Sequence, residues 1–135
     1  MTYGLKRAGI HAVIANDFAE SACVTLKTNC PEIHVLFGDI TKEEIKKQIL
    51  DAGVSAGADI ICGGPPCQGF SMAGTRIRNG AFLDDPRNYL FKHYVNIVKI
   101  VRPRMFILEN VKGILTMQKG EIFNEILKTF SDKTL

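Results

Sequence analysis

Short apolar runs alternate with segments of helical periodicity along the whole chain, and this alternation limits the possible folds more than any other sequence feature. The runs cover residues 12–15, 33–37, 58–62 and 105–108. Most are almost continuously apolar, as in parallel strands that helices cover on both faces. Strands that alternate with helices predict an α/β domain with a mostly parallel sheet and flanking helices.

Helical patterns fill the intervals between these runs. Thr41-Lys42-Glu43-Glu44 has the form of a capping box and predicts the start of a helix. Pro103 predicts the end of a helix that carries an apolar stripe. The apolar stripes of the predicted helices are Ala19, Ala22, Cys23 and Leu26; Ile45 and Ile49; Leu90, Tyr94, Ile97, Val98 and Val101; and Phe123, Ile126, Leu127 and Phe130. The chain opens on a helix-like piece and ends on a helix, so we expect an incomplete fold that lacks a first strand and C-terminal strands.

Length and composition exclude several classes of protein. The 135 residues are 46% hydrophobic and 23% charged, which is ordinary for one folded domain and unlike a disordered chain. There is no apolar run of about 20 residues and no signal-peptide layout, so we expect no membrane span and a cytoplasmic location. The four cysteines are then expected to be reduced thiols. Their spacing is poor for zinc, and we expect no metal site.

Charge is divided unequally along the chain. Residues 1–67 carry 6 basic and 8 acidic side chains, whereas residues 68–135 carry 11 basic and 6 acidic ones. This asymmetry suits a protein with one face turned towards an anion. Segregated solvated charge is the more common explanation, so the asymmetry alone does not predict a nucleic-acid partner.

Polar residues follow the predicted strands, where open α/β sheets bind their ligands. The residues that follow the four runs are Asn16-Asp17, Gly38-Asp39, residues 63–68 and Glu109-Asn110. Asp39 can equally be a helix N-cap. Asp17 stands where nucleotide-binding folds place the acid that accepts ribose hydroxyls. We expect these groups to meet at one rim of the sheet.

The segment Gly63-Gly64-Pro65-Pro66-Cys67-Gln68-Gly69-Phe70-Ser71 is the most informative in the chain. Its glycines permit backbone conformations that are closed to other residues, and its prolines stiffen the backbone around them. This places Cys67 on a rigid shelf outside the sheet, although a free cysteine is often only a small buried hydrophobe. Glu109 ends an apolar strand, so we expect burial to favour its protonated form and a proton-donor role. An ion pair with Arg87 or Arg104 is the alternative.

These motifs, taken in order, closely resemble the DNA (cytosine-5) methyltransferases over nearly all 135 residues. Residues 63–71 resemble the family's catalytic Pro-Cys motif, and Glu109-Asn110-Val111 resembles its Glu-Asn-Val motif. Asn16-Asp17 and Gly38-Asp39-Ile40-Thr41 are similar to its cofactor-binding acids. The resemblance implies a Rossmann-like methyltransferase fold with S-adenosylmethionine as methyl donor and double-stranded DNA as partner. Residues 1–135 would then be a partial catalytic domain without the target-recognition domain.

The resemblance also implies a role for each site residue. Cys67 would add to C6 of a flipped-out cytosine, Glu109 would act at N3, and C5 would accept the methyl group. The implied cofactor-binding residues are Asp17, Phe18, Asp39, Ile40 and Leu90. The implied cytosine- or DNA-binding residues are Pro66, Gln68, Ser71, Arg76, Arg78, Asn110 and Val111. The target sequence is not readable from this chain, nor is the existence of a cognate restriction enzyme.

Two other functions remain open from the sequence. The chain could be a non-catalytic remnant or split-subunit module that docks on a complementary polypeptide, in which case Cys67→Ala would leave binding unchanged. It could also be an unrelated thiol enzyme that pairs Cys67 with a histidine. The absence of a histidine from the predicted strand ends counts against the thiol enzyme.

Overall fold

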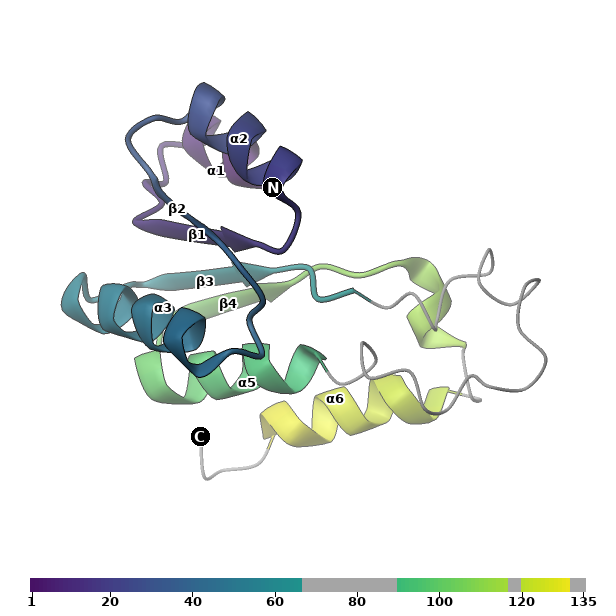
Figure 1. The fold of residues 1–135 in the computed structure, drawn as a ribbon. Coiled ribbons are helices and arrows are strands. Elements are labelled where there is room, and N and C mark those ends of the chain that lie inside the picture. Colours follow the sequence, from purple (N-terminus) through teal and green to yellow (C-terminus); the bar gives the residue numbers. More distant parts are fainter. Residues whose placement is uncertain (67–89, 117–119, 132–135) are drawn as a thin grey trace. The chain divides into compact units, whose positions relative to one another are not determined.

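The computed structural model describes residues 1–66, 90–116 and 120–131, and in these ranges strands alternate with helices as predicted (Figure 1). The chain forms two compact units, Met1–Ile60 with Pro103–Met105 and Ile61–Arg102 with Phe106–Leu135. None of the described helices is both long and apolar enough to cross a membrane.

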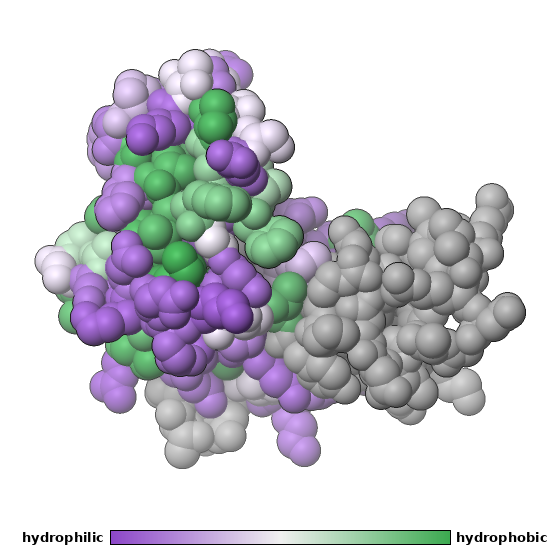
Figure 2. All heavy atoms as spheres, viewed as in Figure 1, coloured by the Kyte–Doolittle hydropathy of each residue, from purple (hydrophilic) through white to green (hydrophobic). Residues whose placement is uncertain are grey.

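The first unit contains a parallel strand pair. Its elements are α1 (Thr2–Arg7), β1 (Ile14–Asp17), α2 (Glu20–Asn29), β2 (His34–Phe37) and α3 (Glu43–Ser55). In the β1–β2 pair, Ile14 lies opposite His34 and Asp17 lies opposite Phe37. Both strands therefore end at the same edge. Helix α2 packs on both strands and α3 contacts β1. Hydrophilic side chains gather over α3 in Figure 2. Two residues of this helix, Lys47 and Asp51, form an exposed ion pair.

The second strand pair leads into the second unit. The elements are β3 (Ile60–Gly63), α5 (Leu90–Val101), β4 (Met105–Leu108), the 3₁₀ helix η3 (Lys112–Leu115) and α6 (Glu121–Ser131). β3 pairs with β4. Glu109 N–H donates to Gly63 O and Met105 N–H to Asp59 O. The two hydrogen bonds therefore join residues with the same separation in sequence, Asp59 with Met105 and Gly63 with Glu109. This separation stays constant along a strand pair only when the two strands run parallel.

Helices α5 and α6 lie on one side of the β3–β4 pair (Figure 1). The core of this unit is a cluster of apolar side chains from α5, η3 and α6 with β4 against it: Phe91, Val95, Ile114 and Ile126, with Leu108, Phe123 and Phe130 packed around them. Phe106 of β4 stacks on Phe130, with ring centroids 4.4 Å apart. Three members of the predicted α5 stripe, Tyr94, Ile97 and Val98, are buried, so the periodicity predicted a packing face correctly. Phe91 and Val95, which enter the core cluster, were not part of that stripe.

Three local predictions are wrong. The capping box fails because α3 begins after Lys42, and Asp39 Oδ1 accepts the Thr41 N–H instead. Asn16 and Asp17 belong to β1 and do not follow it. β4 is not buried on both faces, because Met105, Phe106 and Ile107 remain 49%, 40% and 38% exposed. The predicted parallel pairing is present as two two-stranded sheets in the described residues.

Candidate active site

Two carboxylates mark the carboxyl edge of the β1–β2 pair. Asp17 is the last residue of β1 and is exposed, and its Oδ1 accepts the Ala19 N–H at 2.8 Å. Asp39 lies two residues past β2, and its Oδ1 accepts the Thr41 N–H at 2.9 Å. Both acids therefore close a short turn with one oxygen. The N-cap of α3 is Lys42, so the N-cap alternative for Asp39 is wrong.

Asn16 joins the ends of the two strands. Its Nδ2 donates to both Leu36 O and Gly38 O at 3.0 Å, and Gly38 N–H donates to Asp17 O at 3.0 Å. A Cβ at Gly38 would overlap the side chain of Ile45, so glycine lets the chain turn close to α3. The resulting brace fixes the backbone that carries Asp39. The sequence pattern placed Asn16 beside a functional acid but gave no sign of a role of its own.

The two acids and their neighbours form a set that suits a nucleoside. Phe18 is 75% exposed and follows Asp17 directly, and Ile40 is half-buried next to Asp39. Carboxylate oxygens accept hydrogen bonds from ribose hydroxyls and from an exocyclic amino group, and apolar side chains can contact a base. This donor and acceptor chemistry fits S-adenosylmethionine, as the resemblance implied. Leu90, the fifth implied cofactor residue, is the half-buried first residue of α5 in the second unit.

In the second unit, the chain that leads to Cys67 lies against the Glu-Asn-Val motif. Besides the bond from Glu109 N–H to Gly63 O at 2.8 Å, the Asn110 Nδ2 donates to Pro65 O at 3.2 Å. A Cβ at Gly64 would lie 3.2 Å from the Glu109 Oε2, so the carboxylate closely approaches this backbone. The sequence prediction that these two motifs lie together is confirmed for the described residues 63–66 and 109–111.

The position of Glu109 differs from the prediction in one respect. The residue is exposed, so the expectation of a buried carboxylate is wrong. The reason is that β4 ends at Leu108 and Glu109 lies beyond the packed part of the strand. Of the two arginines predicted to pair with Glu109, Arg104 pairs with Asp59 at 3.5 Å instead, and Arg87 lies outside the described residues.

The remaining predicted residues divide into two groups. Pro66 and Val111 are exposed at the edges of the two motifs, and the Asn110 Oδ1 accepts the Val111 N–H at 2.8 Å. The other predicted site residues lie outside the described residues: Cys67, Gln68, Ser71, Arg76 and Arg78. Their assignments therefore stay predictions.

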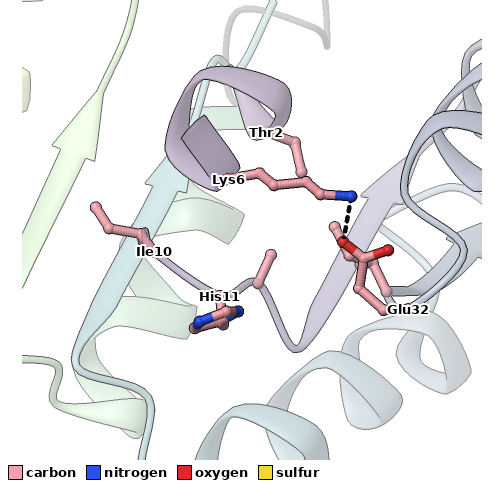
Figure 3. Close-up of a pocket in the computed structure, with 7 residues that line it drawn as sticks. Thr2, Lys6, Ile10, His11 and Glu32 are labelled. Atoms are coloured by element: carbon pink, nitrogen blue, oxygen red, sulfur yellow. Dashed lines mark ion pairs between the residues drawn. The ribbon is translucent and has the colours of Figure 1, made fainter. Parts of the chain in front are cut away.

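A small pocket in the first unit holds none of the predicted site residues. Lys6 and Glu32 form an ion pair of 2.8 Å across it, and His11 lies beside them (Figure 3). The hydrogen bond raises the pKa of Lys6 and lowers that of Glu32, but exposed pairs of this kind add little stability. The lining residues Ala12 and Ile33 precede β1 and β2. Because α/β sheets bind ligands at the opposite strand ends, the pocket is a poor candidate site.

Tyr94 has a second role that the sequence did not predict. Its spacing marks it only as a member of an apolar stripe, but its hydroxyl lies 3.0 Å from both Ile61 O and Ile107 O. Burial, with the neighbouring Cys62 thiol, raises the pKa of Tyr94 well above its usual range, so the hydroxyl stays protonated. Burial likewise raises the pKa of the Cys62 thiol. A tyrosine at helical spacing carries no sequence signal that separates such a contact from simple packing.

Comparison with known proteins gives a consistent result. The family model for C-5 cytosine-specific DNA methylases matches residues 1–133. Type II methyltransferase M1.HphI of Haemophilus parahaemolyticus is 39% identical over 94% of this chain, which corresponds to 33% of its own length. Type II methyltransferase M.AquIA of Picosynechococcus is 35% identical over 94% of this chain and 50% of its own length. The chain thus spans a third to a half of these relatives.

Solved structures agree with the sequence comparisons. A protein assigned as a DNA modification methyltransferase, encoded within an E. coli prophage, is 32% identical and superposes with a TM-score of 0.72 over 95% of this chain and 33% of its own. A Spodoptera frugiperda DNMT2 variant is 30% identical, with a TM-score of 0.59 over 92% of this chain and 36% of its own.

Proposed function

The chain belongs to the C-5 cytosine-specific DNA methylase family, and from this premise we propose that it carries the cofactor-binding and catalytic residues of a DNA (cytosine-5) methyltransferase. Such an enzyme transfers a methyl group from S-adenosylmethionine to C5 of a cytosine in double-stranded DNA. The observation that supports this most is the pairing of the Pro-Cys segment with Glu109-Asn110 through two hydrogen bonds.

In the proposed reaction the protein first makes C5 of cytosine nucleophilic. The Cys67 thiolate would donate an electron pair to C6, and a proton from Glu109 would go to N3, so that the ring becomes an enamine. Because Glu109 is exposed, its role rests on the family resemblance and not on burial. When bound, S-adenosylmethionine would supply the methyl group to C5 and would leave as S-adenosylhomocysteine. Loss of the C5 proton to a base expels Cys67 as thiolate, N3 returns its proton, and the aromatic ring is restored. The Glu109 carboxylate lies close to the backbone that precedes Cys67, which supports the assignment of these two roles to Cys67 and Glu109.

Cofactor binding is assigned to the carboxyl edge of the first strand pair. Asp17 would accept the ribose hydroxyls and Asp39 the adenine amino group, while Phe18 and Ile40 would contact the base. For Leu90, the assignment as a cofactor residue rests on the family resemblance alone. The exposed carboxylate of Asp17 and the exposed ring of Phe18 support this assignment. The Asn16 brace would hold the two strand ends in place.

DNA binding is assigned to the segment around Cys67. A cytosine inside a duplex is out of reach, so it must be flipped out at a cost of a few kcal/mol. Pro66, Asn110 and Val111 would then contact the flipped base and its surroundings. The further residues proposed to contact DNA are Gln68, Ser71, Arg76 and Arg78, with the arginines on phosphates.

The proposal is tested by trapping the covalent intermediate. A duplex with 5-fluorocytosine at the target has no C5 proton to lose, so the full-length gene product that carries this chain should remain covalently bound to the DNA when the cofactor is present. We expect Cys67→Ala to abolish the adduct. Cys62→Ala, five residues away, removes an equivalent thiol and should retain it.

The measurement is a denaturing gel with labelled DNA, followed by mass spectrometry of the linked peptide. Glu109→Gln should slow adduct formation by about 100-fold with an unchanged cofactor Kd, because it removes only the proton donor. The proposal is wrong if the wild-type protein forms no adduct. An adduct that persists in Cys67→Ala equally contradicts it.

A further inference from the structure

Tyr94 reaches from α5 to the strands that carry both catalytic motifs. Its side chain is 6% exposed, and its hydroxyl oxygen lies 3.0 Å from a carbonyl on each strand, Ile61 O on β3 and Ile107 O on β4. These carbonyls belong to residues two positions before Gly63 and Glu109. A hydroxyl has one proton to donate, so the two carbonyls share it. The contact therefore joins the strands immediately before their functional ends.

The ring of Tyr94 also lies directly against Gly63. A Cβ at Gly63 would stand 2.5 Å from Cε2 and 2.6 Å from Cδ2 of the ring. Separations below 3.0 Å essentially never occur for a real Cβ, so this glycine is required by its contact with the tyrosine. Here the missing side chain allows close approach of an aromatic ring to the strand end that leads into Pro65, Pro66 and Cys67.

The same glycine contacts the other motif on its carbonyl side. Gly63 O accepts the Glu109 N–H at 2.8 Å. Tyr94, Gly63 and Glu109 therefore form a continuous chain of contacts within one unit. A shift of the ring would move Gly63, and a shift of Gly63 would move both the Glu109 backbone and the start of the Cys67 segment.

We propose that Tyr94 is a positioning residue that sets the separation between Glu109 and the backbone preceding Cys67. The inference rests on the proposed methyltransferase function for its catalytic consequence but not for its structural one. Tyr94 would act through Gly63 without touching the cytosine. Its hydroxyl fixes the two strands to each other, and its ring fixes how closely β3 approaches α5.

Simple core packing is the competing explanation for a buried tyrosine. The ring does make an edge contact with Phe130, at a centroid distance of 6.3 Å. Packing alone, however, would require neither a hydroxyl shared between two strands nor a glycine under the ring. The two explanations predict different results for a variant that keeps the ring.

The experiment compares Tyr94→Phe, Gly63→Ala and Tyr94→Ile with the double variant Gly63→Ala/Tyr94→Ile, all in the full-length gene product. Tyr3→Phe, in which a 60% exposed tyrosine of α1 loses its hydroxyl, is the matched control. The first measurement is hydrogen exchange at the Glu109 amide, with the His34 amide of β2, which donates to Val13 O at 3.2 Å, as internal reference. The second is the rate of adduct formation with 5-fluorocytosine DNA at saturating DNA and cofactor.

We expect Tyr94→Phe to speed exchange at Glu109 about tenfold and to slow adduct formation about tenfold. The KM for DNA and the exchange at His34 should not change, and Tyr3→Phe should behave as wild type. Gly63→Ala should be more damaging, by about 100-fold in adduct rate. Adding Tyr94→Ile should recover part of that loss, because the branched aliphatic side chain leaves room for the new methyl group. The double variant should then form the adduct faster than the product of the two single-variant effects on the rate predicts.

The inference is overturned if Tyr94→Phe exchanges and reacts as wild type. Independent effects of Gly63→Ala and Tyr94→Ile would overturn it as well, and this comparison remains decisive if one single variant is poorly folded. A wild-type protein that forms no adduct would instead contradict the proposed function. In that case the hydrogen-exchange rates at the Glu109 amide would by themselves test the positioning role of Tyr94.

Discussion

At the scale of single residues, amide side chains hold the loops that carry the candidate functional groups. Asn16 on β1 donates to two carbonyls at the end of β2, and Asn110 after β4 donates to Pro65 O after β3. In each strand pair, an asparagine in one strand or just after it therefore fixes the chain that leaves the neighbouring strand. Neither contact is visible in hydrophobic periodicity, because that pattern reports which residues are buried and not which carbonyls they meet.

The Asn16 brace leads to a stability prediction. Asn16→Ala removes two hydrogen bonds from a half-buried site, and we expect it to lower the free energy of unfolding by about 1–2 kcal/mol. Urea denaturation measures this loss. The urea concentration at the unfolding midpoint should fall, while the slope of the unfolding free energy against urea concentration should stay unchanged. Asn29→Ala is the matched control, because its Nδ2 donates to Thr25 O on an exposed helix face and not across a strand pair. Equal effects of the two substitutions would show that Asn16 is no brace.

At the scale of elements, periodicity predicted most helices and strands, and polar side chains shifted their ends. β1 extends through Asn16 and Asp17 because the amide of Asn16 itself bonds to β2, so polar residues continue the strand. α3 begins later than its capping box predicts because Asp39 has already taken the Thr41 N–H. The stripe of α5 was predicted as a packing face, but the contact of Tyr94 with Gly63 depends on a strand distant in sequence. Such contacts cannot be derived from local spacing.

The sequence and the structure place the N-cap of α3 at different residues, Thr41 and Lys42. Lys42 is the N-cap, has an extended backbone and makes no side-chain capping bond. Lys42→Ser should therefore supply a missing acceptor and raise the free energy of unfolding by about 1 kcal/mol. Thr41→Ala should have an effect below about 0.5 kcal/mol, whereas a true capping box would make it destabilising by about 1 kcal/mol. Thermal and urea denaturation of both variants decide the question, and a destabilised Thr41→Ala would favour the capping box.

At the scale of the whole molecule, the two halves of the sequence differ in both charge and chemistry. The half up to Cys67 is net acidic and holds the candidate cofactor acids, whereas the following half has 11 basic and 6 acidic residues. When the sequence is considered alone, segregated solvated charge is a more common explanation of this arrangement than an anionic partner. Membership of a DNA methylase family favours the partner, because neutralising phosphates is the main sequence-independent contribution to DNA binding.

This interpretation predicts a change in salt dependence that is independent of target sequence. Each phosphate contact adds about 0.9 to the slope of log K against log salt, because binding releases condensed counterions. Arg76→Ala/Arg78→Ala in the full-length gene product should therefore make the slope shallower by about 2, as measured by fluorescence anisotropy of a labelled duplex in increasing NaCl. Lys27→Ala/Lys47→Ala removes the same charge from exposed positions of the acidic half and should leave the slope unchanged. If both pairs change the slope equally, net charge alone governs the affinity, and the segment after Cys67 does not track the DNA backbone.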